Sequence, residues 1–169
     1  MTEPIIITFT PNERDYSSTL QAFSFKRKQT WVILAIWALV TLYFVKMIFE
    51  GFWRDPSIGW VFLLGSLVFI TTFLYTPFKT AKQISSNKAF TNPITWQVDA
   101  TEIIVKNSES ESKFSWNTFG KVDELPDYYL FVYASNPRMY QFLPKRAFVN
   151  PAQQADFHHL IKQQGKISK

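Results

Sequence analysis

The sequence predicts an α+β membrane protein, in which a transmembrane helical hairpin is joined to a small antiparallel β-barrel capped by a C-terminal helix. Two patterns predict it. Long apolar stretches lie in the first half of the chain, and short segments of alternating apolar and polar residues follow in the second half. The 169 residues include 17 Phe and 6 Trp, an aromatic content typical of membrane interfaces and of small β cores.

The two apolar stretches are Trp31 to Phe49 and Ile58 to Phe78. As helices, each is long enough to cross a hydrocarbon core of about 30 Å. The first contains a single charged residue, Lys46, and the second contains none. Neither has the polar face that helices of a soluble bundle usually show. The polar link between them is too short to cross the lipid again, so we expect two antiparallel transmembrane helices.

The distribution of basic residues predicts the orientation of this hairpin. Lys26, Arg27 and Lys28 precede the first stretch, Lys79, Lys82 and Lys88 follow the second, and the link contains only Arg54. Since cytoplasmic loops carry an excess of Lys and Arg, both termini are expected in the cytoplasm. The basic triplet before the first helix serves as a topology signal, as a contact for anionic lipid, or as both.

The N-terminal segment predicts a strand over Ile5 to Phe9, followed by a helix. Thr10 is the expected N-cap, Pro11 the first helical residue, and Glu13 the partner in a capping box. Small residues are candidates for close helix approach in the membrane, namely Ala35 and Ala38 in the first span and Gly65 and Ser66 in the second.

From Pro93 onward, the pattern changes to a period of two and predicts six short strands separated by turns. The chain then ends in a helix, with Asn150 as N-cap, Pro151 as its first residue and Gln153 as the capping-box partner. Strands followed by one C-terminal helix are the element order of a pleckstrin-homology-like (PH-like) fold. The strand at Ile5 to Phe9 is expected to pair with an edge of this barrel, because it would otherwise expose both of its own edges.

The second half of the chain contains the run Phe114-Ser115-Trp116-Asn117-Thr118-Phe119, the residues Lys121-Val122, Glu124 and Tyr128 to Val132, and the run from Phe142 to Phe148. These segments resemble the YcxB-like family of bacterial membrane proteins. The order of parts is also similar: a short N-terminal segment, two transmembrane helices and a PH-like domain. The resemblance implies a bacterial plasma membrane and implies no established activity, so no catalytic residue is carried over.

The expected organisation has four parts. Residues 1–30 form the N-terminal strand and an amphipathic juxtamembrane helix, and residues 31–78 form the transmembrane hairpin. Residues 79–92 form a membrane-exit helix and linker, and residues 93–169 form the PH-like cytoplasmic domain with its C-terminal helix.

The sequence offers little that indicates catalysis or a cofactor. Cysteine is absent, which excludes disulfides and thiolate chemistry. His158 and His159 are adjacent and therefore point to different faces of a helix, whereas metal ligands on a helix favour a spacing of four. Asp123, Glu124 and Asp127 are expected in a solvated turn. We therefore expect no enzyme activity, no catalytic residue, no metal site and no cofactor.

These patterns favour a non-catalytic, membrane-anchored PH-like module that binds a protein or an anionic lipid at the cytoplasmic face. The candidate anion contacts are Lys26, Arg27, Lys28, Arg138, Lys145 and Arg146. The alternative is an accessory subunit of a membrane transport or envelope-assembly complex. Expected partners are the lipid bilayer and either a protein partner or a second copy of the chain; neither nucleic acid nor a small-molecule substrate is inferred.

Overall fold

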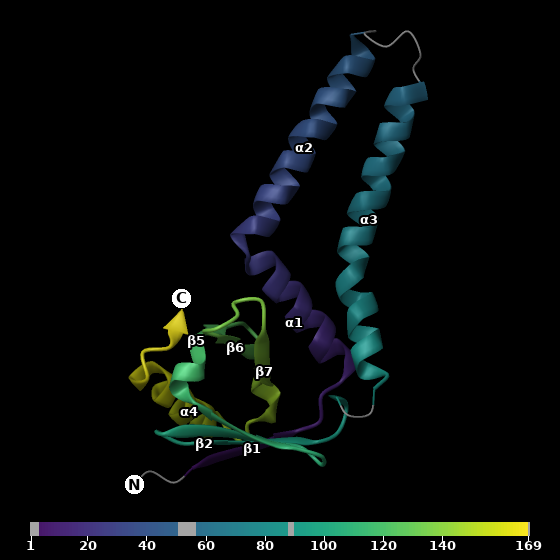
Figure 1. The fold of residues 1–169 in the computed structure, drawn as a ribbon. Coiled ribbons are helices and arrows are strands. Elements are labelled where there is room, and N and C mark those ends of the chain that lie inside the picture. The colour runs from purple at the N-terminus through teal and green to yellow at the C-terminus, as the bar shows by residue number, and fades with distance from the viewer. Residues whose placement is uncertain (1–3, 51–56, 88–89, 169) are drawn as a thin grey trace. The chain divides into compact units, whose positions relative to one another are not determined.

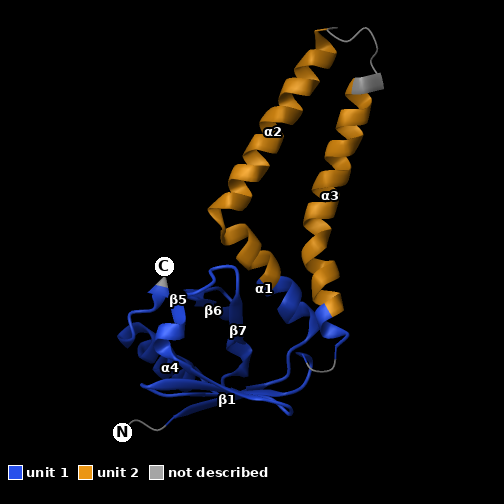
Figure 2. Ribbon diagram, viewed as in Figure 1, with its two compact units in different colours: residues 1–19, 84–169 blue, residues 20–83 orange. Residues whose placement is uncertain are grey.

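The computed structural model describes residues 4–50, 57–87 and 90–168 (Figure 1). The chain divides into two compact units, coloured separately in Figure 2. Unit 1 comprises residues 1–19 and 84–169 and contains the strands, whereas unit 2 comprises residues 20–83 and contains the long helices. Unit 2 is therefore an insertion in the sequence of unit 1. Arg54 and Lys88, used above to predict orientation, lie outside the described residues.

The first sheet of unit 1 has the strand order β1-β2-β3-β4. Its strands are β1 (Ile5–Phe9), β2 (Ile94–Val98), β3 (Glu102–Lys106) and β4 (Glu111–Ser115). β1 pairs antiparallel with β2 along its whole length, from Ile5 opposite Val98 to Phe9 opposite Ile94. The expected pairing of the N-terminal strand with an edge of the β domain is therefore confirmed.

The second sheet has the order β7-β6-β5-β8. It contains β5 (Phe119–Glu124), β6 (Tyr128–Tyr133), β7 (Tyr140–Pro144) and the short β8 (Ile167–Ser168), which lies parallel to β5 and was not predicted. A closed barrel was also predicted, but the strands of the described residues form two separate sheets. The 3₁₀ helix η2 (Trp116–Thr118) accounts for the difference, because it turns the chain between β4 and β5 before they can form a ladder.

The two sheets share one aromatic core. Trp96 of β2 contacts Phe131 of β6 with ring centroids 5.0 Å apart, and Phe114 of β4 lies 5.5 Å from Phe119 of β5. The Trp116 indole N–H donates to the Asp99 carbonyl at 2.9 Å, so this buried tryptophan is satisfied. Large rings therefore fill the space between the two sheets.

Helix α4 (Pro151–Gln163) covers this core with Phe157 and Ile161, both fully buried. Its start follows the prediction, since the Asn150 side chain accepts from the Gln153 N–H at 2.8 Å. The Gln153 side chain has two further partners: it accepts from the Val149 N–H at 2.9 Å and donates to the Ile6 carbonyl at 3.0 Å. One residue thus closes the helix start and ties it to β1.

Helix α1 (Glu13–Lys26) begins two residues later than the predicted cap requires. The expected N-cap at Thr10 with Glu13 is wrong. Instead Asn12 Oδ1 accepts from the Asp15 N–H, and Asp15 Oδ2 accepts from the Asn12 N–H, each at 2.9 Å. This reciprocal pair forms the capping box because both side chains reach the partner's backbone, so it fixes the buried Asp15 carboxylate in place.

Unit 2 is built on the helices α2 (Lys28–Phe49) and α3 (Ser57–Ser85), which are long and apolar enough to cross a membrane. They run antiparallel, because Phe44 stacks on Phe62 at 3.8 Å while Trp37 lies 4.4 Å from Phe69. α2 begins immediately after Arg27, whose extended backbone separates it from α1. α3 continues without a break past Phe78 and ends at Ser85, within the range of residues 79–92 expected to form a membrane-exit helix and linker.

The helix contact is largely aromatic, and the predicted small residues contribute less than expected. Ala35 and Ala38 are exposed, and a Cβ built on Gly65 would meet nothing within 4 Å. Ser66 is buried, as the prediction requires. The helices approach closely at Gly59, where an added Cβ would lie 2.6 Å from Ile48 Cγ1. Rings on both helices therefore set the spacing along most of the hairpin.

Neighbouring residues of β1 provide a matched test of its role in the fold. The side chain of Ile7 is 1% exposed, whereas that of Ile6 is 54% exposed. Ile7→Ala should lower the free energy of unfolding by about 2–4 kcal/mol, because it leaves a cavity in the shared core. Ile6→Ala should change it by less than about 0.5 kcal/mol. Chemical denaturation of the detergent-solubilised protein, followed by near-UV circular dichroism, measures both; equal losses would contradict the assigned register.

Candidate functional site

A surface cleft lies where the start of α1 meets the 3₁₀ helix η3 (Lys145–Ala147), and its volume is ≈ 410 Å³. It is called the α1 cleft below. Its lining includes three basic side chains, Arg14, Lys145 and Arg146, and two carboxylates, Asp15 and Asp127. The fold thus brings two of the predicted anion-binding residues, Lys145 and Arg146, to the same cleft as Arg14 of α1, which lies far from them in the sequence.

Asp15 is the centre of this cleft's hydrogen bonding. Its side chain is 2% exposed and forms an ion pair with Arg146. The Tyr128 hydroxyl donates to Asp15 Oδ1 at 3.1 Å, and the Asn12 backbone N–H donates to Oδ2. A buried carboxylate requires such partners, since an unpaired charge in this position would be strongly destabilising. The pair therefore holds the first turn of α1 against β6 and η3.

The ion pair is asymmetric in exposure. The Arg146 side chain is 50% exposed, in contrast to the enclosed Asp15 carboxylate. Within the described residues, one terminal nitrogen of the guanidinium, Nη2, makes two hydrogen bonds, to Asp15 and, at 3.5 Å, to the Thr10 carbonyl. One side of Arg146 is consequently fixed by the protein while the rest borders the cleft.

Tyrosines surround the same helix start. The Tyr16 hydroxyl donates to the Phe90 carbonyl at 2.5 Å, and the Tyr140 hydroxyl contacts Thr19 Oγ1 at 3.4 Å. Burial, together with the nearby Asp15 charge, raises the pKa of Tyr16 to about 12. Burial and the same carboxylate also raise the pKa of Tyr128, and burial raises the pKa of Tyr140. All three phenols therefore stay protonated donors at neutral pH.

Lys145 points to a second acidic partner. Its Nζ donates to Glu124 Oε1 at 2.8 Å and lies 5.0 Å from the centre of the Tyr129 ring. Glu124 also has His158 Nδ1 at 3.4 Å from its other oxygen. The Lys145 charge is thus largely compensated within the protein, although the residue lines the α1 cleft.

The other predicted anion contacts lie elsewhere. Arg138 is exposed in the turn before β7, where its backbone N–H donates to Asn136 Oδ1 at 3.0 Å. Lys26, Arg27 and Lys28 lie at the junction of α1 and α2, and Arg27 lies over the Phe23 ring at 5.2 Å. Because α2 and α3 are antiparallel, this triplet and Lys79 of α3 lie at the same end of the hairpin. Anion binding by any of these residues stays a prediction.

The other acidic residues and the histidines considered above as possible catalytic or metal-binding residues do not form a site. Asp123 is buried and pairs with Lys121 at 2.9 Å, so it lies in a strand rather than in the solvated turn that was expected. Within the described ranges, no three His, Asp or Glu side chains gather as a metal site would require.

Sequence patterns did not identify Asp15 or Arg14 as site residues. The capping signal was assigned to Thr10 and Glu13, and the partner of Asp15 is 131 positions away. The available signal was an acidic residue three positions after Asn12, which fits a capping box equally well.

The Asp15–Arg146 pair can be tested by its contribution to stability. Arg146→Gln should lower the free energy of unfolding by about 2 kcal/mol, because it leaves the Asp15 carboxylate buried without its cation. The loss stays below that of a fully buried pair, since half of the Arg146 side chain is exposed. Arg138→Gln, which changes an exposed arginine in the same way, should have almost no effect. Chemical denaturation measures both.

A double variant completes this test. Asp15→Asn combined with Arg146→Gln removes both charges and should recover much of the stability lost in Arg146→Gln. Additive losses in the double variant would show that the two side chains are not energetically coupled.

Alkaline pH should weaken unit 1 through its buried tyrosines. Each raised pKa means that the folded state holds the phenolic proton more tightly than the unfolded state. The stabilisation is therefore complete below the ordinary pKa of 10.0 and is lost as the pH rises toward about 12, the folded value for Tyr16. Thermal unfolding between pH 9 and pH 12 should show this fall, and Tyr16→Phe should make it shallower; an unchanged slope in that variant would contradict the assignment.

Comparison with known proteins bears on unit 1. Neither the curated proteins nor the solved structures contain a match to this chain. Residues 98–161, which run from the end of β2 into α4, match the family model described as YcxB-like protein. The matched range contains all of the motifs that carried the resemblance, including Arg146, and two candidate membrane helices precede it. The resemblance to the YcxB-like family is therefore confirmed, and residues 98–161 are its YcxB-like segment.

Proposed function

We propose that this protein is a membrane-anchored binding module, whose PH-like β domain engages a protein or anionic-lipid partner at the cytoplasmic face of a bacterial plasma membrane. The observation that carries the proposal is the exposure of the two long apolar helices. Only 6% of the most apolar stretch of each helix is buried by the rest of the protein. Helices this apolar require either a protein partner or lipid around them, and the hairpin provides neither on its outer faces.

The pattern of burial argues for lipid rather than for a soluble core. The outward side chains of α2 include Ile36, Leu39 and Leu42, and those of α3 include Leu64 and Leu67, all exposed. A core helix of a soluble protein would have these residues covered. In a bilayer, the same residues face acyl chains while the aromatic seam between the helices remains packed.

The pairing of β1 with β2 supports placing both ends of the helical hairpin on the same side of the membrane. β1 precedes α2 in the sequence and β2 follows α3, yet the two strands form one ladder. A hairpin that crosses the bilayer twice returns the chain to its starting side, so this pairing is compatible with insertion. The basic residues Lys26, Arg27, Lys28, Lys79 and Lys82 flank the apolar spans at that end and favour the cytoplasm.

The PH-like assignment is supported by element order. Apart from the short parallel β8, all strands pair antiparallel in two sheets over one core, and α4 follows the last long strand. The proposed mechanism is local concentration: the anchor keeps the domain in a thin layer at the membrane, where partners meet it more often. Lys26, Arg27 and Lys28 would add contacts with anionic headgroups at the start of the first membrane helix, α2.

The absence of cysteine makes the topology directly testable. Two single-cysteine variants are needed. One is Asp55→Cys in the link between the spans, and the other is Asn117→Cys at an exposed position of η2. In intact cells, a membrane-impermeant maleimide should label Asp55→Cys and leave Asn117→Cys unlabelled. After the membrane is permeabilised, both should react.

Fractionation tests the anchoring itself. The full-length chain should sediment with membranes and stay there in alkaline carbonate, which strips peripheral proteins. Recovery in the soluble fraction would overturn the anchor, and labelling of Asn117→Cys alone in intact cells would reverse the proposed orientation.

A further inference from the structure

The α1 cleft contains an arginine prepared to hold an anion. Asp15, itself enclosed by Tyr128 and Asn12, fixes Arg146 through one terminal nitrogen. Among the described residues, Nε and Nη1 of this guanidinium have no hydrogen-bond acceptor, and half of its side chain is exposed. A guanidinium held on one side offers its other N–H groups without first losing conformational freedom, which favours binding of a planar or tetrahedral oxyanion.

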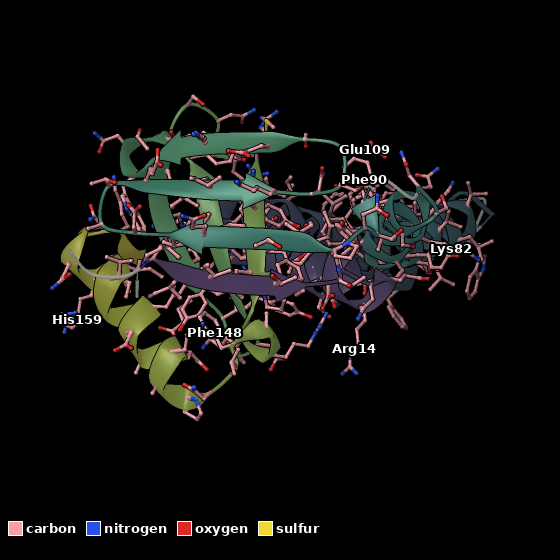
Figure 3. The ribbon with its side chains drawn as sticks, turned by 90° about the horizontal axis from the view of Figure 1, so that it is seen from below. Arg14, Lys82, Phe90, Glu109, Phe148 and His159 are labelled. Atoms are coloured by element: carbon pink, nitrogen blue, oxygen red, sulfur yellow. The ribbon has the colours of Figure 1, made fainter. Side chains whose placement is uncertain are left out.

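A second arginine borders the same cleft. Arg14 occupies the first turn of α1, beside Asp15, and lines the cavity with Arg146. In the described part of the chain, its side chain has no acidic partner, and Figure 3 shows Arg14 extended outward from the ribbon. Two arginines therefore line one opening of ≈ 410 Å³.

The acidic residues of the cleft have different roles. The Asp15 charge is compensated by Arg146, so it opposes an incoming anion much less than an isolated carboxylate would. Asp127 is exposed where it lines the cleft and forms no ion pair among the described residues. Its charge should weaken the binding of an anion, which makes it a useful reporter of where that anion lies.

We propose that the α1 cleft binds a phosphate group, with Arg14 and Arg146 as its two charged donors. A phosphate monoester carries up to two charges and three acceptor oxygens, which two guanidinium forks match better than they match a single carboxylate. The group has two possible sources, a phosphomonoester lipid headgroup or free inorganic phosphate. This inference rests on the proposed binding role and names the chemistry that one site would recognise.

The first experiment uses the full-length protein in nanodiscs of phosphatidylcholine, titrated with inorganic phosphate by isothermal titration calorimetry. Saturable binding is expected. Arg14→Gln should raise the dissociation constant roughly tenfold, because one charge-assisted contact is lost. Asp127→Asn should lower it, and Lys113→Gln, which removes an exposed cation outside the cleft, should leave it unchanged.

Arg146 needs a variant that keeps the fold. Asp15→Asn with Arg146→Gln removes the anion donor together with the carboxylate it compensates, so no buried charge is left alone. This double variant should bind phosphate at least tenfold more weakly than the parent. Equal affinity of the parent, Arg14→Gln and the double variant would overturn the site, as would weakening by Lys113→Gln to the same degree.

The second arm separates the two sources. In nanodiscs that contain phosphatidic acid, a lipid headgroup in the cleft should block phosphate binding, and the Arg14→Gln variant should not show this competition. Unchanged phosphate binding in those nanodiscs would assign the site to free phosphate. No binding of phosphate and no effect of phosphatidic acid would overturn the inference, while the fractionation and labelling results would still decide the membrane anchor independently.

Discussion

The antiparallel ladder between β1 and β2 is the constraint on which the rest of the structure depends. It joins Ile5–Phe9 to Ile94–Val98 across the whole helical insertion, so both ends of that insertion must return to one folded unit. The ladder also completes a sheet whose inner residues, Ile7 and Trp96 among them, enter the shared core. Without β1, β2 would become an unpaired edge and one side of the aromatic core would lose its cover.

The polar contacts around Asp15 continue this attachment beyond the strand. Gln153 binds the Ile6 carbonyl, Arg146 binds Asp15 and the Thr10 carbonyl, and Tyr128 binds Asp15. Each of these three side chains comes from the YcxB-like segment, while their partners lie in residues 5–19. The matched segment is therefore not a complete folding unit, and the N-terminal residues contribute both a strand and a buried charge to it.

Local patterns were sufficient to predict most elements. Uninterrupted apolar composition located α2 and α3, alternation located β2, β3 and β6, and the Asn-Pro-x-Gln start located α4.

The prediction of a closed barrel was wrong, because alternation of apolar and polar residues predicts that a strand exists but says little about which other strand it pairs with. β8 was missed because Ile167 and Ser168 are too few to show a period. The capping box was assigned to Thr10 and Glu13 but is formed by Asn12 and Asp15. The two capping signals overlap in the sequence, and only the packing of the folded protein decides between them. Lys145 and Arg146 were recognised as a basic pair, but their acidic partners could not be found, since Glu124 in β5 lies 21 positions away and Asp15 in α1 lies 131 positions away.

The separation of β1 from β2 in the sequence also affects how the protein is made. The apolar strand Ile5–Phe9 is synthesised before both long helices, and its partner Ile94–Val98 is synthesised only after them. Contacts so distant in sequence form late, and an unpaired apolar strand is prone to aggregation in the meantime. In the proposed membrane-anchored state, early insertion of the two apolar helices would hold this strand beside the membrane until β2 is made, and would keep the unpaired strands of separate chains from meeting.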